Sequence, residues 1–581
     1  MLNNVEIRHL HSGHLPVVRG CLDRLGIQDV LDRHLPAHPQ SQASDAECTV
    51  AMVLNILSGR VALWQMDDHL AGMDVELLLG EGVEASWFHD TRLGKALDRI
   101  DAAGTDTLLS EIVLGYLTSS EPAPYSVHLD TTSFVLYGAY LDAEEPVPLH
   151  GYSKDRRPDL KQLVFGMSVH SGLGFPLTAT MCSGNTSDHT ANRAHIAQLA
   201  SLLPERDEVT IVADCKLVDA TTLGQLVTSG FHFVSLVPDA QNLRGNLICK
   251  AWDKFENIED WPILATKPGK RKASPRLHYR GMSFPAYVGM RIGDTDDKQL
   301  SAELMRGLVV YSDQLAARFD ESLAKKLKHE KDKLEAAMKK LPKTFACDAD
   351  ARAALVPLTK KLKFHIAELS AIPEDVVEKR TARGRPRKDA PPPPTTTVWT
   401  PNVVLQVDDE AIAAARRKAS CFVLITDWPE DRWSDQKVLG EYRHQALIEG
   451  HTGFRWLKGP AAVAPLFLKS SRRIRALGFV FMLALMVRNY IQFTLRREMK
   501  KRGRGVRHPF SKKIDDNLTT EVAMVLFDKQ ISGFAKLPGE AWRRVPPKLP
   551  EPAKDVLQLL GLDESVYAKP PPRRKRMEDA R

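Results

Sequence analysis

The sequence predicts a mixed α/β protein whose central sheet is interrupted by a large insertion and preceded by a helical domain. Short runs rich in Val, Phe, Leu and Thr lie between residues 126 and 237, and a similar run returns at 421–426. Between residues 17 and 70, apolar residues instead recur at three- and four-residue spacing, which is typical of helices. Two candidate acidic residues, Asp214 and Glu449, lie 235 positions apart, and that interval predicts an inserted domain.

The elements follow one another in a clear order. Residues 1–118 predict a helical N-terminal domain, with DNA-end binding as one possible role. The strand-like runs of residues 119–240 predict the first part of the mixed α/β core. Its expected strands and single helix are Ser126–Leu136, Gln162–His170, Pro176–Met181, helix Thr190–Leu203, Val209–Ala213 and Phe231–Val237.

The insertion is expected at residues 241–417. It combines a strand-rich part at 279–293 and 307–311, a helical hairpin around the apolar stripe of 315–341, and a basic, proline-rich linker. Residues 418–495 predict the second part of the core. Residues 496–581 form a basic C-terminal region, whose tail beyond about 545 is expected to be disordered.

Composition favours a soluble, cytoplasmic protein that binds a polyanion. Lys and Arg exceed Asp and Glu by 80 to 73, for a net charge of +7. The seven cysteines form no Cys-x-x-Cys pair, which argues against a disulfide framework or a zinc knuckle. The N-terminus lacks the apolar segment of a signal peptide. The most apolar stretch, Ala476–Val487, is 12 residues long and predicts a buried core helix.

Three acidic residues are the best candidates for chemistry. Asp130 shares one face of a predicted strand with Ser126 and His128, Asp214 follows the buried run 209–213, and Glu449 lies on a predicted helix. On that helix Val438, Tyr442, Ala446 and Glu449 share a face, which would deliver Glu449 to the sheet. The simpler interpretation, that either aspartate only caps a turn, is at least as good for each one alone.

Carboxylates that converge in a cleft need a cation, because an isolated buried charge is very costly. Magnesium is a hard cation that prefers oxygen ligands. Two such ions held by carboxylates activate a water or a 3′-hydroxyl and stabilise the leaving oxygen in phosphodiester chemistry. The three acids therefore indicate DNA chemistry with two Mg²⁺ ions, for which Mn²⁺ is a substitute.

Four motifs in order resemble bacterial insertion-sequence transposases of the DDE class, in the insertion-sequence-4-like 1634 subgroup. They cover most of the chain and are Asp130–Ser133, Gly151–Gln162, Gly184–Asp188, and the segment Tyr442…Glu449…Gly453–Lys458. The resemblance implies a ribonuclease-H-like core, with Asp130, Asp214 and Glu449 as the metal-binding triad. It also implies metal-dependent cleavage at the ends of a mobile element and joining of the 3′ ends to target DNA. Synapsis of two ends suggests a homodimer.

The chain departs from the family pattern after Tyr442. Gln445 stands where the family has Arg, and Lys458 comes two residues later than the family's Lys. Either the glycines of Gly450–Gly453 end the helix, or Arg455 and Lys458 approach phosphate differently. This departure leaves two other functions open: a catalytically decayed regulator that binds the ends, and a hydrolytic nuclease without strand transfer.

Several basic residues are candidates for DNA binding. Lys154, Arg156, Arg157 and Lys161 follow the first strands and are expected to hold phosphates, whereas Asp155 and Asp159 are expected to pair with these bases. Arg383 and Arg385 form either a minor-groove hook or merely a basic linker. The rings of Trp428, Trp433 and Trp456 suit base stacking, but buried packing is the better interpretation. Zinc binding by His128, His444 and His451 is less plausible than second-shell or surface roles.

Overall fold

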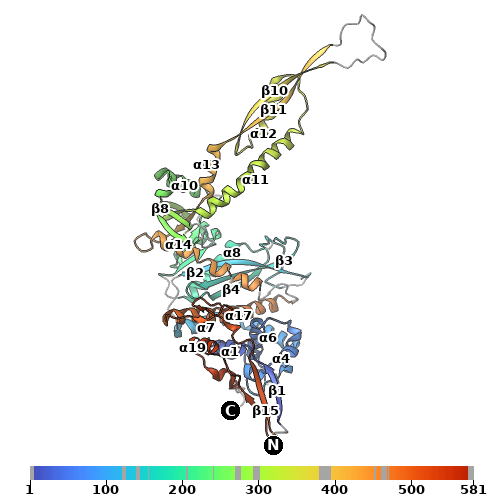
Figure 1. Ribbon diagram of the computed structural model, residues 1–581, viewed down its shortest axis with the longest axis vertical. Helices are drawn as coiled ribbons and strands as arrows, with labels where there is room; N and C mark the ends of the chain where they lie inside the picture. The colour runs from blue at the N-terminus through green and yellow to red at the C-terminus, as the bar shows by residue number, and fades with distance from the viewer. Residues whose placement is uncertain are drawn as a thin grey trace, which may run out of the picture.

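The computed structural model describes most of the chain as a lower helical body, a central sheet and a long projecting arm (Figure 1). It describes residues 5–38, 40–120, 126–138, 140, 144–154, 156–203, 207–239, 241–268, 276–291, 301–377, 394–450, 453–459, 468 and 470–573. Arg383 and Arg385 lie outside these ranges, as do Asp155 and His451.

The helical body is built from the N-terminal segment. Its helices are α1 (Leu15–Arg24), α2 (Ile27–His34), α3 (Asp45–Leu57), α4 (Met66–Ala71), α5 (Val75–Leu79), α6 (Asp90–Ala103) and α7 (Thr105–Ser120). Helix α3 begins with a capping box, in which the Glu47 amide donates to Ser44 Oγ and the Ser44 amide donates to Glu47 Oε2. Strand β1 (Glu6–His11), which the helical pattern of this region did not predict, pairs antiparallel with β15 (Ile531–Lys536) near the other end of the chain.

Helix α17 (Ser471–Lys501) joins this body to the sheet. It packs on α3, α6 and strand β4 (Phe175–Ser183), and residues 476–487 are buried. The helix is long and apolar enough to cross a membrane by length and composition alone, but 89% of its most apolar window is buried inside the protein. The expectation of a core helix at Ala476–Val487 is therefore confirmed.

A nine-stranded mixed sheet forms the centre of the molecule. Its strands in spatial order are β4, β3 (Lys161–His170), β2 (Ser126–Leu136), β5 (Thr210–Ala213), β6 (His232–Leu236), β12 (Cys421–Thr426), β9 (Ser301–Ser312), β8 (Leu277–Met290) and β7 (Ile263–Lys267). Strands β2, β3 and β4 are antiparallel neighbours, whereas β2, β5 and β6 run parallel. The connecting helices include α8 (Asp188–Leu202), α9 (Ala220–Thr228) and α10 (Asn242–Lys254). The mixed α/β class is as predicted.

The strand-rich part of the expected insertion belongs to this same sheet, which corrects the prediction of a separate domain starting at residue 241. Strand β9 pairs with β12 from Cys421↔Tyr311 to Thr426↔Arg306, and β8 and β7 follow outward. Without β9, one edge of the buried strand β12 would be left with unpaired backbone groups. Strand β9 pairs with this edge of β12, and β8 and β7 extend the sheet beyond β9.

The projecting arm therefore starts only after β9. It consists of α11 (Asp313–Met338), α12 (Asp348–Thr359), the antiparallel pair β10 (His365–Val377) and β11 (Thr395–Val407), and the returning helix α13 (Asp409–Ala419). Figure 1 shows these elements extending away from the sheet. The apolar stripe of 315–341 lies mostly on the single helix α11, with α12 as a separate shorter helix, rather than forming both halves of a hairpin.

The expected disorder beyond residue 545 is wrong for residues up to 573. Strand β16 (Arg543–Val545) pairs with β15, and the small elements β13 (Val506–Arg507), β14 (Ile514–Asp515) and α18 (Thr520–Met524) precede them. Helix α19 (Glu551–Leu559) buries Val556 and Leu557, and the Tyr567 hydroxyl donates to the Gly13 carbonyl at 2.7 Å. The segment around α19 is ordered despite its many prolines and charges, because its apolar face packs against other parts of the protein.

A buried histidine makes this core sensitive to acid. Residue His195 on α8 is fully buried, with its ring nitrogens at 3.0 and 2.8 Å from the Thr178 and Thr180 hydroxyls. Burial lowers its pKa to about 4. Between about pH 6.5 and 4, the unfolded chain therefore binds a proton at His195 that the folded chain does not bind. The free energy of unfolding falls as the pH drops through this window, by up to roughly 3 kcal/mol.

We expect His195→Gln to lose less thermal stability between pH 7 and pH 5 than the wild type does. Unfolding followed by circular dichroism at both pH values measures the difference. The exposed His150→Gln is the matched control and should keep the wild-type pH dependence. An unchanged pH dependence in His195→Gln would show that this histidine does not carry the effect.

Candidate active site

Strand β2 and the helices α14 (Asp435–Arg443) and α15 (Ala446–Glu449) run alongside each other and share a ladder of contacts. Ser126 Oγ donates to Glu441 Oε2 at 2.7 Å, and His128 Nδ1 lies 3.2 Å from Gln445 Oε1. The Gln445 carbonyl accepts from the Glu449 amide at 3.3 Å, so Glu449 follows Gln445 by one helical turn. Its charge adds to the raised pKa of Asp130, so the two carboxylates lie near each other.

The ladder also explains a break that the sequence analysis did not predict. The expected single helix through Val438 and Glu449 is interrupted at His444 and Gln445, between α14 and α15. Gln445 is buried and donates through Nε2 to the Leu129 carbonyl at 3.0 Å, so the turn is fastened to the strand. The Gln445 side chain therefore anchors the start of α15 to β2.

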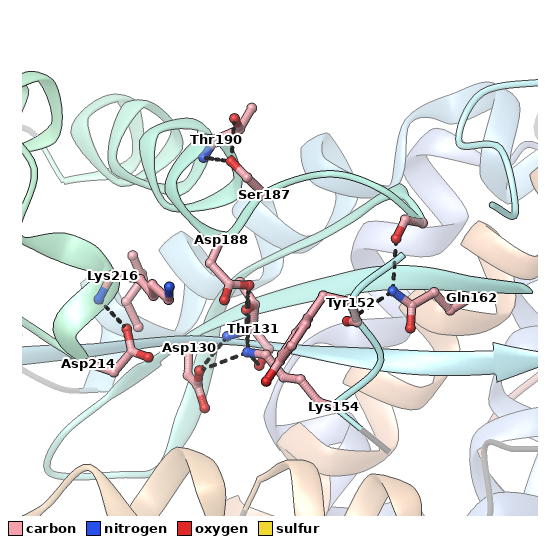
Figure 2. Close-up of polar contacts among 12 residues, drawn as sticks. Asp130, Thr131, Tyr152, Lys154, Gln162, Ser187, Asp188, Thr190, Asp214 and Lys216 are labelled. Atoms are coloured by element: carbon pink, nitrogen blue, oxygen red, sulfur yellow. Dashed lines mark hydrogen bonds and ion pairs between the residues drawn. The ribbon is translucent and has the colours of Figure 1, made fainter. Parts of the chain in front are cut away.

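Asp214 reaches the same place through the sheet. Strands β2 and β5 pair in parallel register with Ser126↔Thr210 and His128↔Val212. The same offset, two positions further, sets Asp214, directly after the end of β5, level with Asp130 in the middle of β2. Figure 2 shows the two carboxylates on neighbouring segments. Asp214 Oδ1 accepts from the Lys216 amide at 2.9 Å, which fixes one oxygen of the side chain.

The three acids influence one another electrostatically. Burial raises the pKa of Asp130 to about 7, and the charges of Asp214 and Glu449 add to this rise while Lys154 opposes it. Partial desolvation and the charge of Asp214 also raise the pKa of Glu449. Burial raises the pKa of the nearby Tyr442 hydroxyl, with the charges of Asp214 and Glu449 as further causes. The folded chain thus concentrates negative charge where strand ends and helix meet.

Lys154 is the cation that partly balances this charge. Its ammonium donates to the Thr131 carbonyl at 2.6 Å and the Thr131 hydroxyl at 2.8 Å, and lies 3.8 Å from Asp130 Oδ1 and 3.6 Å from Asp188 Oδ1. Asp188 in turn accepts from Thr131 Oγ1 at 2.6 Å. The sequence pattern marked Asp188 only as the last residue of the motif Gly184–Asp188. Its place directly after the N-cap Ser187 of α8, within a recognised motif, was the available signal.

A cavity of about 390 Å³ adjoins Lys154 and Asp188. One wall is Tyr152, whose side chain is strongly exposed, at 90% for the whole residue, although its backbone is held in place. The buried Gln162 donates through Nε2 to the Tyr152 carbonyl at 3.2 Å and to the Gly184 carbonyl at 2.9 Å (Figure 2). A Cβ at Gly184 would lie 2.0 Å from the Gln162 carbonyl, so only glycine allows the two loops to approach this closely.

The helix ends at Glu449, as one alternative from the sequence proposed. Gly453 follows so tightly that a Cβ there would lie 1.9 Å from the Ile448 carbonyl. A new helix, α16 (Phe454–Lys458), then carries Arg455 and Lys458. Arg455 is exposed, and the Lys458 ammonium lies 5.9 Å from the centre of the Phe134 ring on β2. These two bases therefore do not share the helix of Glu449.

The remaining predicted residues differ in their exposure and in their partners. Arg157 pairs with Asp159 at 2.7 Å, as expected, and Arg156 is exposed beside it in a positive-φ conformation. Lys161 begins β3, and Tyr442 packs near Phe422. Buried packing, rather than base stacking, is confirmed for the three tryptophans Trp428, Trp433 and Trp456. His128 is buried and His444 exposed.

The donor chemistry suits magnesium, although the side chains are not gathered around an ion. In the part of the chain that the structure describes, no group of three or more His, Cys, Asp or Glu side chains is arranged to hold a metal as it stands. The three coupled carboxylates nevertheless offer only oxygen ligands and a local excess of negative charge, which is what a hard divalent cation requires. Metal binding by this triad stays a prediction.

Comparison with known proteins gives limited matches. Residues 5–114 match a family model described as a domain of unknown function, DUF4277. No curated protein matches the chain. The chain is similar to the piggyBac transposase synaptic complex with hairpin DNA, at 10% identity and a TM-score of 0.26, over 52% of this chain and 63% of that one. It is also similar to the Mos1 transposase paired-end complex with left transposon end.

The Mos1 likeness has 14% identity and a TM-score of 0.14, and covers 34% of this chain and 60% of that one. This chain thus spans less than two thirds of the length of either solved structure. TM-scores this low do not establish a shared fold or a shared chemistry, so the functional assignment depends on the site itself.

Proposed function

We propose that this protein is a DNA transposase of the DDE class, which cuts DNA at the ends of a mobile element and transfers the 3′-hydroxyl ends into target DNA. The observation that carries this proposal is the convergence of Asp130, Asp214 and Glu449. Parallel strand register aligns the first two, and the ladder between β2 and α14–α15 brings in the third. The motif resemblance, which involves the same residues, supports the same reaction class.

In this proposal Asp130, Asp214 and Glu449 hold two Mg²⁺ ions, with Mn²⁺ as a substitute. When bound, such ions lower the pKa of an attacking water or hydroxyl and stabilise the leaving oxygen. The protein's own contribution is to keep three carboxylates together despite their repulsion and to place Lys154 beside them. Because Lys154 already lies between Asp130 and Asp188, it is positioned to contact a phosphate that enters the site.

The other parts of the proposal follow the fold. The spatial order β4-β3-β2-β5-β6, with an antiparallel triplet joined to two parallel strands, supports a ribonuclease-H-like core. Arg156, Arg157, Lys161, Tyr442, Arg455 and Lys458 are proposed to contact DNA, and so are Arg383 and Arg385, which lie outside the described residues. A homodimer would bring two element ends together, and the cytoplasm, with association to the nucleoid, is the proposed location.

The deciding experiment uses a linear duplex carrying the DNA that flanks the gene, incubated with the full-length protein. Mg²⁺-dependent nicking at the element boundary and joined target products support a transposase. Nicking without joined products indicates a hydrolytic nuclease. Specific binding without nicking, in Mg²⁺ and in Mn²⁺, indicates a decayed regulator. Cleavage that persists in EDTA contradicts the metal-dependent mechanism.

The cavity beside Lys154 leads to a separate expectation. A nucleotide next to the cleaved phosphate would find the exposed Tyr152 ring on a fixed backbone. Stacking of a base on an aromatic side chain is worth about 1–3 kcal/mol. We expect Tyr152→Ala to reduce cleavage at subsaturating DNA by roughly tenfold, and Tyr152→Phe to retain most of it.

Single-turnover cleavage measures both variants. Tyr287→Ala removes another exposed tyrosine, from β8, and should leave the rate unchanged. A Tyr152→Ala protein that cuts as well as the wild type would show that the ring does not contact the substrate.

A further inference from the structure

A second basic site lies on the arm, away from the acids. It is a cavity of about 350 Å³ between α11 and the segment that joins α12 to β10. Four lysines and a histidine line it, namely Lys326, His329, Lys333, Lys361 and Lys363. Two of the lysines, seven residues apart, come from one face of α11 and two from a loop more than twenty-five residues later, so the fold, not a local charge run, gathers them.

We call this cavity the lysine groove. The one carboxylate among the described residues that line it, Glu330, already accepts hydrogen bonds from the protein itself. Glu330 accepts hydrogen bonds from the Lys363 amide at 2.5 Å and the Phe364 amide at 3.0 Å, and lies 2.8 Å from His365 Nδ1. Its side chain is 13% exposed. These bonds hold the loop of Lys361 and Lys363 against α11 and leave the outward charge of the groove positive.

Strand β10 of the arm has a different character. The strand positions Glu368 and Glu374 of β10 are exposed, and so are the apolar residues Ile366 and Ile372. These carboxylates disfavour a polyanion along β10, whereas the α11 side presents the four lysines of the groove. On that side the Lys326 ammonium lies 4.1 Å from the centre of the Phe319 ring, which limits its freedom before any ligand binds.

The position of the groove indicates which anion it takes. Helix α11 leaves the sheet directly after β9, and Lys326 and Lys333 lie 13 and 20 residues beyond its start. At 1.5 Å per residue the groove is about 20–30 Å further out. This is comparable to one turn of B-DNA, about 34 Å. A duplex held at the acids can therefore continue along the arm.

We propose that the lysine groove binds the phosphate backbone of double-stranded DNA, on the arm about 20–30 Å beyond the start of α11. This inference rests on the proposed function for the identity of the polyanion. The contact carries no sequence information, because lysines on phosphates read charge and spacing only. It adds affinity and fixes the direction in which the duplex leaves the site.

Salt dependence tests the groove directly. The full-length triple variant Lys326→Gln/Lys333→Gln/Lys361→Gln and the wild type are compared by fluorescence anisotropy on a 40-bp duplex of mixed sequence, in EDTA. Each lost phosphate contact lowers the slope of log Kobs against log salt by about 0.9. We expect the triple variant to lose 2 to 3 units of slope and at least about tenfold in affinity at 0.1 M salt.

A matched control removes the same charge from another face of α11 and from its C-cap residue, Lys339. Lys328→Gln/Lys331→Gln/Lys339→Gln should change the slope by less than about half a unit. Circular dichroism melting confirms that both triples are folded. If both triple variants lose the same slope, DNA binding depends on the overall charge of the arm, and the proposal that the groove binds DNA is wrong. An unchanged slope in the first triple, or groove-dependent binding of tripolyphosphate with DNA binding unaffected, overturns it as well.

The test also separates this inference from the proposed function. Binding is measured without divalent metal, and is repeated in an Asp130→Asn background. If cleavage never occurs but the slope falls in the groove variant, the groove binds DNA and the enzymatic proposal fails. If cleavage occurs and the slope does not change in the groove variant, the proposed enzymatic function holds and the proposed DNA contact at the groove is wrong.

Discussion

Replacing Asp130 with asparagine should reduce Mg²⁺-dependent DNA cleavage by at least about a thousandfold. The substitution keeps the size of the side chain but removes the negative charge that lies between Asp214, Glu449 and Lys154. Duplex affinity measured in EDTA should change by less than about threefold, because the basic residues proposed to hold the backbone remain. Single-turnover cleavage of an end-labelled duplex and anisotropy binding give the two numbers.

Asp159→Asn provides the matched control for this experiment. Asp159 lies in the same motif region but is exposed and paired with Arg157, so its loss should leave cleavage within about twofold of the wild type. The double variant Asp130→Asn/Asp214→Asn should be no slower than either single variant, since residues that act as one unit have non-additive effects. Asp130→Asn protein that cuts at the wild-type rate would contradict the assignment.

Local patterns in the sequence were enough to predict the parts of this site. The alternation at Ser126, His128 and Asp130 correctly gave one face of β2, and the apolar run before Asp214 gave the end of β5. The structure then shows contacts from that face to Glu441 and Gln445. Patterns of this kind work because side-chain direction along a strand depends on neighbouring residues only.

Features that depend on distant segments could not be predicted in the same way. The register between β2 and β5, which aligns Asp130 with Asp214, is set by pairing across more than eighty residues. Strands β7 to β9 were placed in a separate domain because nothing local shows that β12 has an edge to fill. Helix α19 looked disordered from composition, although its apolar face finds a partner in the helical body.

Lys154 shows how charge balance modifies a prediction. Its sequence position suggested a phosphate contact, and its ammonium is instead held by Thr131 between Asp130 and Asp188 in the free protein. Both roles are compatible if the ammonium exchanges carboxylates for phosphate when DNA enters. The sequence could identify the cation but not its partners, because Asp188 belongs to a motif more than thirty residues later.

The second large effect is expected at Gln445, which positions Glu449 without contacting substrate. Its amide bridges the Leu129 carbonyl and His128 on β2, at the break between α14 and α15. Without this anchor the short helix α15 should shift relative to Asp130. A displacement of about 1 Å in such a site can cost roughly a hundredfold in rate. We therefore expect Gln445→Ala to cut DNA about a hundredfold more slowly, with DNA affinity in EDTA unchanged.

A positioning role has a signature beyond the rate. Gln445→Ala should weaken the apparent affinity for Mn²⁺, measured by titration of the metal-free protein, because Glu449 no longer meets the two aspartates together. Gln436→Ala, at an exposed position of the preceding helix α14, should change neither quantity. If Gln445→Ala loses thermal stability but retains normal Mn²⁺ affinity and cleavage, Gln445 serves the fold alone, and the placement of Glu449 must depend on the tight turn at Gly453.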